Sequence, residues 1–234
     1  MSDNKVVVVA GAGPGNGAAL AQRFAAAGRR VAMLSRDQEH AEALAAKITG
    51  ARGYACDVSA EASVKSCLAA ISTDLGEVDT LLYNAGSRLF GDVETITADQ
   101  FEQAWRVDAL GSLLCAREVI PAMKAKVAGN IVFIGATASR RGGKMFAAIA
   151  PAKAAQRSLA ESMARSLWPA GIHVALIVID GVVDLERTRA KMRDKSDDFF
   201  VDPAGVAEIA WQLTQQSRRA WSFEVEARPL GESW

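Results

Sequence analysis

The glycine-rich segment near the start of the chain could hold a phosphate group. It follows the four valines Val6–Val9 and reads Ala10, Gly11, Ala12, Gly13, Pro14, Gly15, Asn16 and Gly17. Glycines permit a tight turn and let the backbone approach a ligand closely. Residues 18–27 continue with Leu20 and Phe24 on one helical face, so the amides and positive dipole end of a helix face the loop. A strand, a glycine loop and a helix in this order favour a dinucleotide site, with an ordinary strand-to-helix turn as the alternative.

The end of the second expected strand bears on which dinucleotide would bind. A carboxylate about 20 residues after the glycines would hydrogen-bond the ribose 2′-hydroxyl of NAD, whereas an arginine suits the 2′-phosphate of NADP. Here Val31–Leu34 is followed by Ser35 and Arg36, and Asp37 is expected to cap the next helix. Because a guanidinium beside a hydroxyl is a good phosphate clamp, the sequence predicts NADP(H) in preference to NAD(H). The alternative is that Arg36 covers a helix end in solvent.

Composition and charge are typical of a globular α/β protein. The 234 residues are 50% hydrophobic, and 27 basic and 27 acidic side chains give zero formal net charge, so nothing indicates a nucleic-acid or membrane surface. No run reaches the roughly 18 apolar residues of a membrane span, and no secretory signal precedes the first strand. The cysteines, Cys56, Cys67 and Cys115, and the two histidines lack metal-ligand spacing. We therefore expect a cytoplasmic protein with reduced cysteines and no metal site.

Apolar periodicity alternates between short buried runs and amphipathic helical segments. Strands are expected near 5–10, 30–35, 52–56, 78–83, 130–135, 172–179 and 221–226. Helices are expected near 16–28, 37–49, 60–75, 98–127, 147–168 and 203–216, with a kink or an end at Pro121. This alternation requires right-handed crossovers and predicts one Rossmann-type α/β domain over residues 1–234, a doubly wound parallel sheet of about seven strands with helices on both faces.

The glycine spacing, Gly-x-x-x-Gly-x-Gly, resembles that of the short-chain dehydrogenase/reductase family. Further segments resemble the family in the same order, namely Tyr83-Asn84-Ala85-Gly86, Ile131–Ile134 as a fifth strand and Gly171–Val174 at the start of a sixth. The resemblance covers nearly the whole chain and implies an oxidoreductase acting on a small molecule that the sequence does not name. It also implies a homodimer or homotetramer, paired through the fourth and fifth helices and the last strand. Residues 184–202 would then be a mobile substrate lid, or else a plain surface connection.

The resemblance assigns further cofactor contacts at the ends of later strands. Asp57 and Val58 resemble the adenine contact, and the segment of Asn84, Ala85 and Gly86 matches the family's Asn-Asn-Ala-Gly. The sixth strand ends in Asp180-Gly181, where the family usually has Pro-Gly followed by a threonine, and Leu185 stands at that threonine position. Gly181 persists, and the backbone near Val183 is expected to meet the nicotinamide carboxamide.

The catalytic positions depart from the family pattern. The family places a tyrosine four residues before a lysine, whose charge lowers the phenol pKa so that the tyrosine can exchange a proton. A serine on strand five steadies the substrate oxygen, and an asparagine supports a water path. Lys153 is retained here, but Ile149, Ala136 and Asp108 stand at the tyrosine, serine and asparagine positions. Both tyrosines of the chain precede the fifth strand, so no shifted alignment restores the set.

Two classes of function remain open. One is an oxidoreductase with an atypical proton route, and the other is a catalytically silent NADP(H)-binding sensor or scaffold. Lys153 is expected to hold the nicotinamide ribose hydroxyls, with an ordinary solvated lysine as the alternative. His173 is expected to be structural. Four polar residues after the fifth strand are expected either to bind an anionic substrate or to lie solvated: Ser139, Arg140, Arg141 and Lys144.

Overall fold

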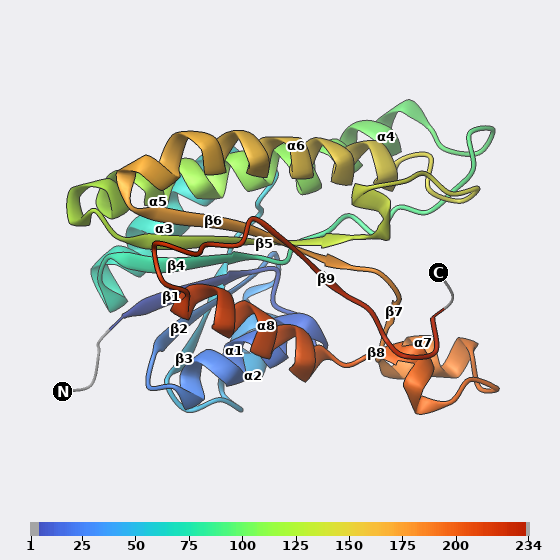
Figure 1. Cartoon of the computed structure of the whole chain (residues 1–234), viewed down its shortest axis with the longest axis horizontal. Helices are drawn as coiled ribbons and strands as arrows, with labels where there is room; N and C mark the ends of the chain where they lie inside the picture. Colours follow the sequence, from blue (N-terminus) through green and yellow to red (C-terminus); the bar gives the residue numbers. More distant parts are fainter. Residues whose placement is uncertain (1–4, 233–234) are drawn as a thin grey trace.

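The computed structural model describes residues 5–232 and is built on a seven-stranded parallel sheet (Figure 1). The strand order is β3-β2-β1-β4-β5-β6-β9. These strands are β1 (Val6–Ala10), β2 (Arg30–Ser35), β3 (Ala51–Ala55), β4 (Val78–Tyr83), β5 (Gly129–Ala136), β6 (Ile172–Ile179) and β9 (Glu224–Ala227). The order reverses between β1 and β4, and ligands of open α/β sheets bind at such a point, outside the carboxyl ends of the strands. The predicted doubly wound sheet is confirmed.

Helices cover both faces of the sheet (Figure 1). One face carries α3 (Glu61–Leu75), α5 (Gly111–Lys126) and α6 (Ile149–Leu167), and the other carries α1 (Asn16–Ala26), α2 (Gln38–Ala45) and α8 (Pro203–Gln215). The valine run of β1 shows why both faces are buried. Val6 and Val8 pack into the first face and Val7 and Val9 into the second, because successive strand side chains point to opposite sides.

The expected helix over 98–127 is interrupted in the structure. It comprises α4 (Ala98–Trp105), a π-helical turn (Arg106–Leu110) and α5, so its single unbroken form was wrong. A π-turn inserts an extra residue per turn and changes which side chains face the core. Pro121 lies inside α5 and does not end that helix.

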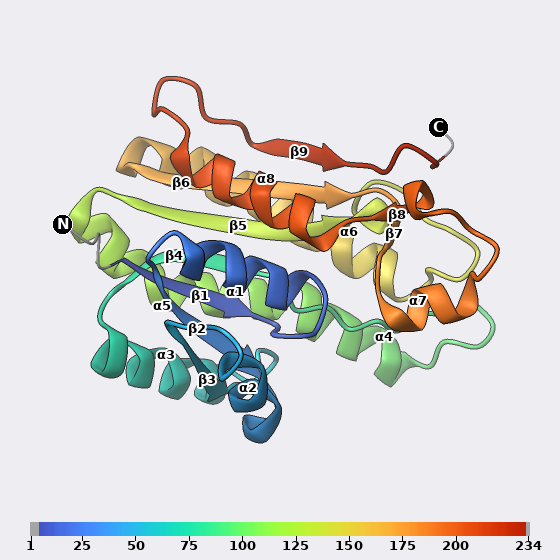
Figure 2. The ribbon, with the colours of Figure 1, turned by 90° about the horizontal axis from the view of Figure 1, so that it is seen from below.

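The last strand begins later than the expected 221–226, at Glu224. The reason lies in His173, whose Nε2 is 2.8 Å from the carbonyl oxygen of Ser222 and whose ring stacks on Trp221 with centroids 4.9 Å apart. These contacts hold 221–222 away from the sheet ladder. His173 is buried and structural, as predicted. Figure 2 shows β9 at the edge of the sheet, beyond β6.

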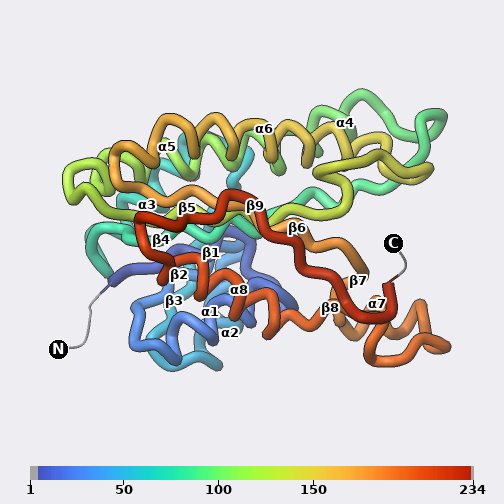
Figure 3. Tube along the Cα trace, in the orientation of Figure 1, coloured from blue at the N-terminus to red at the C-terminus, as the bar shows by residue number. Residues whose placement is uncertain are grey.

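Residues 184–202 form a local unit beside the carboxyl ends of the strands. It contains α7 (Glu186–Lys191) and β8 (Phe200–Val201), which pairs with β7 (Val182–Val183). Figure 3 traces the chain beyond β9 back to this unit, where the amide of Gly231 donates to the carbonyl of Asp198 at 2.8 Å. Among residues 5–232, no helix has the length and apolarity needed to cross a bilayer.

Candidate functional site

A cavity of about 700 Å³ lies at the carboxyl ends of the central strands. Its size is that of a small-molecule or cofactor site. The structure brings many of the predicted site residues together on its wall, namely Gly13, Pro14, Gly15, Asn16, Gly17, Asn84, Gly86, Lys153, Gly181 and Val183. The remaining wall residues were not predicted as cofactor contacts and are Arg88, Ile134, Gly135, Ala136, Ile149, Ile179, Asp184, Leu185, Glu186 and Arg187.

The glycine loop is shaped for close approach of a ligand. Gly11 has a positive φ of 95°, and a Cβ atom on it would lie 2.5 Å from the amide nitrogen of Ala85. The side-chain Nδ2 of Asn84 donates to the carbonyl of Gly11 at 2.8 Å and so ties the loop to the end of β4. No side chain caps the N-terminus of α1, and the buried Oδ1 of Asn16 has no hydrogen-bond partner within the chain. Backbone amides at the N-terminus of a helix, next to glycines that leave room for a ligand, fit the phosphates of a dinucleotide.

The remaining predicted cofactor contacts lie at the neighbouring strand ends, outside the cavity wall. Leu34, the residue before Ser35, accepts hydrogen bonds from Gly11 and Ala12. Arg36 is exposed, and Asp37 caps α2 through the amide of His40 at 3.1 Å, as predicted.

The predicted adenine contacts, Asp57 and Val58, follow β3. Asp57 accepts from the hydroxyl of Ser59 at 2.7 Å, and Val58 is buried beside it. The amide of Cys56 donates to the carbonyl of Ser35 at 2.7 Å, which joins the ends of β2 and β3. Asp57 and Val58 therefore lie at the same edge of the sheet as the glycine loop, with β2 between β3 and β1.

Lys153 is held by partners inside the protein. Its Nζ lies 3.0 Å from Oδ1 of Asp108 and donates to the carbonyl of Ile134 and to Oε1 of Gln156, each at 3.0 Å. Lys153 therefore makes two hydrogen bonds and one ion pair inside the protein, while Oδ1 of Asp108 accepts no hydrogen bond from the described residues. The side chains of Lys153 and Asp108 are 7% and 0% exposed. Oδ2 of Asp108 also accepts from the amide of Ser87 at 3.1 Å, so this carboxylate is held from the side of β4 as well.

A second layer of hydrogen bonds supports this ion pair. Nε2 of Gln156 donates to the carbonyl of Asp108 at 3.0 Å and to Oγ of Ser112 at 2.8 Å. The Ser112 hydroxyl in turn donates to the Asp108 carbonyl at 2.6 Å. Sequence reasoning missed this role of Gln156. The available signal was its position three residues after Lys153, on the same face of α6.

The wall around Lys153 is apolar. Ile149 lies one helical turn before Lys153 and is 8% exposed, and Ala136 ends β5 nearby. The wall residues include no serine, threonine, tyrosine, cysteine or histidine within the part of the chain that the structure describes. Ser139 is buried and accepts from the amide of Ala136 at 3.1 Å, so its hydroxyl serves the local turn. The described residues also contain no cluster of three metal-ligating side chains.

Comparison with known proteins agrees with this fold. Residues 5–196 match the short chain dehydrogenase family. The chain belongs to the short-chain dehydrogenase family. A sorbitol dehydrogenase of Cereibacter sphaeroides is 32% identical over 186 residues, which are 79% of this chain and 72% of that protein.

Solved structures of the family have the same fold. A crystal structure of a short-chain dehydrogenase from Rhodopseudomonas palustris is 36% identical, with a TM-score of 0.82 over 97% of this chain and 99% of that one. A metagenomic short-chain oxidoreductase in complex with NADP is 26% identical, with a TM-score of 0.85 over 99% of each chain. The chain is thus an NAD(P)-binding Rossmann-fold member of an oxidoreductase family.

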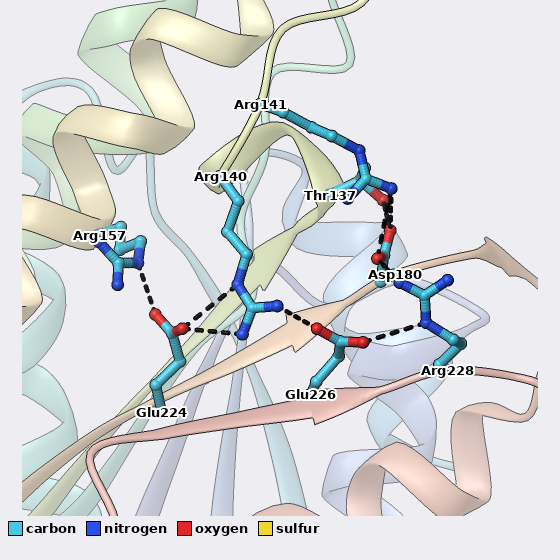
Figure 4. Close-up of polar contacts among 8 residues, drawn as sticks. All are labelled: Thr137, Arg140, Arg141, Arg157, Asp180, Glu224, Glu226 and Arg228. Carbon is cyan, nitrogen blue, oxygen red and sulfur yellow. Dashed lines mark hydrogen bonds and ion pairs between the residues drawn. The ribbon is translucent and has the colours of Figure 1, made fainter. Parts of the chain in front are cut away.

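The arginines after β5 are engaged within this short-chain dehydrogenase (Figure 4). Nη2 of Arg140 lies 2.8 Å from Oε1 of Glu224, and Arg140 also pairs with Glu226. Nη2 of Arg141 lies 3.2 Å from Oδ1 of Asp180. Both arginines are exposed, as the solvated alternative predicted, and they also hold β9 and the end of β6 against the loop after β5. Lys144 is exposed.

Asp180, which stands where the family usually has proline, is the buried centre of this network. It accepts from the hydroxyl of Thr137 at 2.5 Å and pairs with Arg141 and Arg228. Burial alone would raise the pKa of Asp180, but the Thr137 hydroxyl and the two guanidinium charges lower it below its usual value.

We expect Asp180→Asn to lower the free energy of unfolding by about 1–3 kcal/mol at pH 7, because two guanidinium groups lose their carboxylate. Since the folded-state pKa is lowered, the stabilisation is complete above the unfolded-state pKa of about 3.9 and is lost as the pH falls through the folded value. Urea unfolding at pH 7 and at about pH 3 should therefore show a difference from the native protein that shrinks in acid. The exposed Asp194→Asn is the control, and a difference that stays constant with pH would contradict the assignment.

Proposed function

We propose that this chain is an NADP(H)-dependent oxidoreductase whose proton does not come from a side chain at the usual tyrosine position. One observation carries the proposal. A glycine cradle fitted to a dinucleotide opens into a cavity whose wall near Lys153 is made of Ile149 and Ala136. The cofactor end keeps the glycine loop and Lys153, whereas no wall residue in the range 5–232 carries a hydroxyl.

Each part of the site has a task in this proposal. A bound NADPH supplies the hydride. The glycine loop and the amides at the start of α1 hold its phosphates, and Arg36 beside Ser35 holds the 2′-phosphate. Asn84 keeps the loop against β4, and the backbone near Val183 faces the carboxamide.

The reacting end is shaped by apolar residues. Ile134, Ile149 and Ile179 exclude water from one side of the cavity, while its mouth stays accessible. The proton is supplied by water, because the ammonium of Lys153 is held by Asp108 and the other wall residues near it, Ile149 and Ala136, carry no proton donor on their side chains. Substrates with an activated double bond suit this wall, because their reduction places the proton on a carbon atom. Such a reduction needs no hydroxyl to donate a proton to a carbonyl oxygen. Lys153 binds the ribose hydroxyls by giving up one of its three internal partners, which are Asp108, Ile134 and Gln156.

A second candidate is a catalytically silent NADP(H)-binding sensor or scaffold. The closed pair of Lys153 and Asp108 favours it, because the lysine charge is neutralised inside the protein. Following NADPH absorbance with activated alkenes, quinones and ketones separates the two candidates. Turnover of any of these supports the oxidoreductase, and tight binding without turnover supports the sensor.

Cofactor preference is tested by Arg36→Asp. We expect the native protein to bind NADPH more tightly than NADH, and the variant to reverse this order, because a carboxylate repels the 2′-phosphate and accepts from a 2′-hydroxyl. The affinity for NADPH should fall at least about tenfold, as expected for a charge-assisted contact. Calorimetric titration of both cofactors measures it.

Lys65→Asp, the same charge change on the exposed face of α3, is the matched control. Equal or tighter binding of NADH by the native protein would contradict the proposed clamp at Ser35 and Arg36.

We also propose a homodimer or homotetramer paired through residues 98–127, 147–168 and the last strand. Phe101 and Trp105 on α4 are 45% and 44% exposed and lie one helical turn apart, and β9 is an edge strand. Exposed aromatic side chains of this kind are common in subunit contacts. Trp221 packs against His173 and Trp168 of its own chain, so its ring serves the chain's own packing. Trp234 lies outside the described residues.

A further inference from the structure

Two arginines on the cavity wall have no hydrogen-bond or ion-pair partner among the described residues. Arg88 follows β4, two residues after Gly86, and Arg187 is the second residue of α7. Neither makes a hydrogen bond or an ion pair with any residue in the range 5–232. The nearby cations differ in this respect. Lys153 pairs with Asp108, and Arg189 pairs with Asp184 at 2.6 Å and with Asp197 at 2.5 Å.

Both arginines lie beside the glycine loop. A Cβ atom on Gly13 would lie 3.8 Å from Nη2 of Arg88, so this guanidinium is over the loop. On the other wall, Leu185 stands two residues before Arg187 and packs directly against Gly15. The backbone of Arg88 has a φ of 54°, in the left-handed region that side chains other than glycine rarely adopt. Such strain is often found where a side chain is held for binding.

The two positive charges act on each other. Desolvation and the charge of Arg187 lower the pKa of Arg88. The acidic wall residues do not cancel both charges, because Asp184 is already bound by Arg189 in a bidentate pair, and only Glu186 is left. An anion between the two guanidinium groups would relieve their repulsion and accept from both.

We propose that Arg88 and Arg187 form a two-sided clamp for an anionic group, a phosphate or a carboxylate, lying over the glycine loop. The proposal rests on the proposed function, because one source of this anion is the diphosphate of the bound dinucleotide. The other source is the acidic group of a small substrate. Because α7 carries Arg187 and Leu185 already packs against Gly15, a bound anion holds residues 184–202 in this position against the loop. Leu185 stands at the family's threonine position, and its side chain has no hydroxyl to contact the cofactor. The two guanidinium groups supply a contact in its place.

The variants Arg88→Gln and Arg187→Gln test the clamp, with Arg193→Gln as the matched control. Arg193 lies in the same segment and away from the cavity wall, where its Nε donates to the carbonyl of Ala190 at 3.3 Å. Calorimetry with NADPH, ADP-ribose and adenosine 2′-phosphate separates contacts to the diphosphate from contacts to the adenosine half. Malonate, titrated into the NADPH-loaded protein, is the carboxylate probe. Inorganic pyrophosphate is titrated into the protein alone.

If the diphosphate is the anion, each clamp variant loses about tenfold or more in affinity for NADPH and ADP-ribose and none for adenosine 2′-phosphate. If the anion is a substrate group, malonate binding falls by a similar factor while NADPH affinity is kept. Failure of NADPH to bind the native protein would refute the proposed function alone, and pyrophosphate would then decide the clamp. The clamp is overturned if both clamp variants bind every probe with the same affinity as Arg193→Gln. It is also overturned if the native protein binds neither NADPH nor pyrophosphate.

Discussion

Combining Asp108→Asn, Ile149→Tyr and Ala136→Ser should raise NADPH-dependent ketone reduction by about 10²–10⁴-fold, the usual contribution of positioned acid–base groups. The tyrosine would stand one helical turn before Lys153, on the cavity wall, and the serine at the end of β5. The structure adds the reason for the third change. Asp108 neutralises Lys153 at 3.0 Å, so a new phenol would not feel the full lysine charge that lowers its pKa. We therefore expect the tyrosine–serine pair alone to give a smaller gain than the triple variant.

The matched control replaces tyrosine by phenylalanine, which keeps the ring and removes only the hydroxyl. Initial rates are followed by NADPH absorbance with simple ketones and aldehydes. A triple variant no faster than its phenylalanine counterpart would show that the cavity does not keep the family geometry. Robust ketone turnover by the native protein would overturn the proposed assignment of Ile149 and Ala136 to the catalytic positions.

Lys153→Met should lower the free energy of unfolding by about 3–5 kcal/mol, because it leaves the carboxylate of Asp108 buried without its cation. Asp108 is fully buried and would keep only the amide of Ser87 as a donor to its side chain. Adding Asp108→Asn to Lys153→Met should recover part of the loss, since a neutral amide is cheaper to bury than an unpaired charge. Urea unfolding of the single variants and the double variant measures the coupling.

Lys144→Met is the control, because Lys144 is exposed and its replacement should change stability by less than about 0.5 kcal/mol. If Lys153→Met is no less stable than this control, the pair with Asp108 contributes little. Lys153 would then be available to a ligand, as the family resemblance implies.

The order of elements could be predicted from the sequence because it depends on local patterns. The valine run of β1 is buried on both faces, and Gly11 needs its positive φ, so residue type alone identified the strand and the loop. Asp37 was identified as a helix cap for the same reason, since its bond to the amide of His40 spans three residues. The family motifs then placed Lys153, Ile149 and Ala136 in register, and the structure puts all three on one cavity wall.

Where side chains from distant elements meet was decided only by the tertiary structure. The π-helical turn that presents Asp108 to Lys153 has no apolar period of its own, so the sequence predicted an unbroken helix there. The partners of Arg140 come from β9, 84 residues further along the chain, and without them the side chain looked either solvated or free to bind an anion. Arg88 follows β4 and Arg187 lies on α7, and only the tertiary structure brings both to the glycine loop. Periodicity reports which face of an element is buried, whereas the pairing of charges depends on long-range contacts that no local pattern encodes.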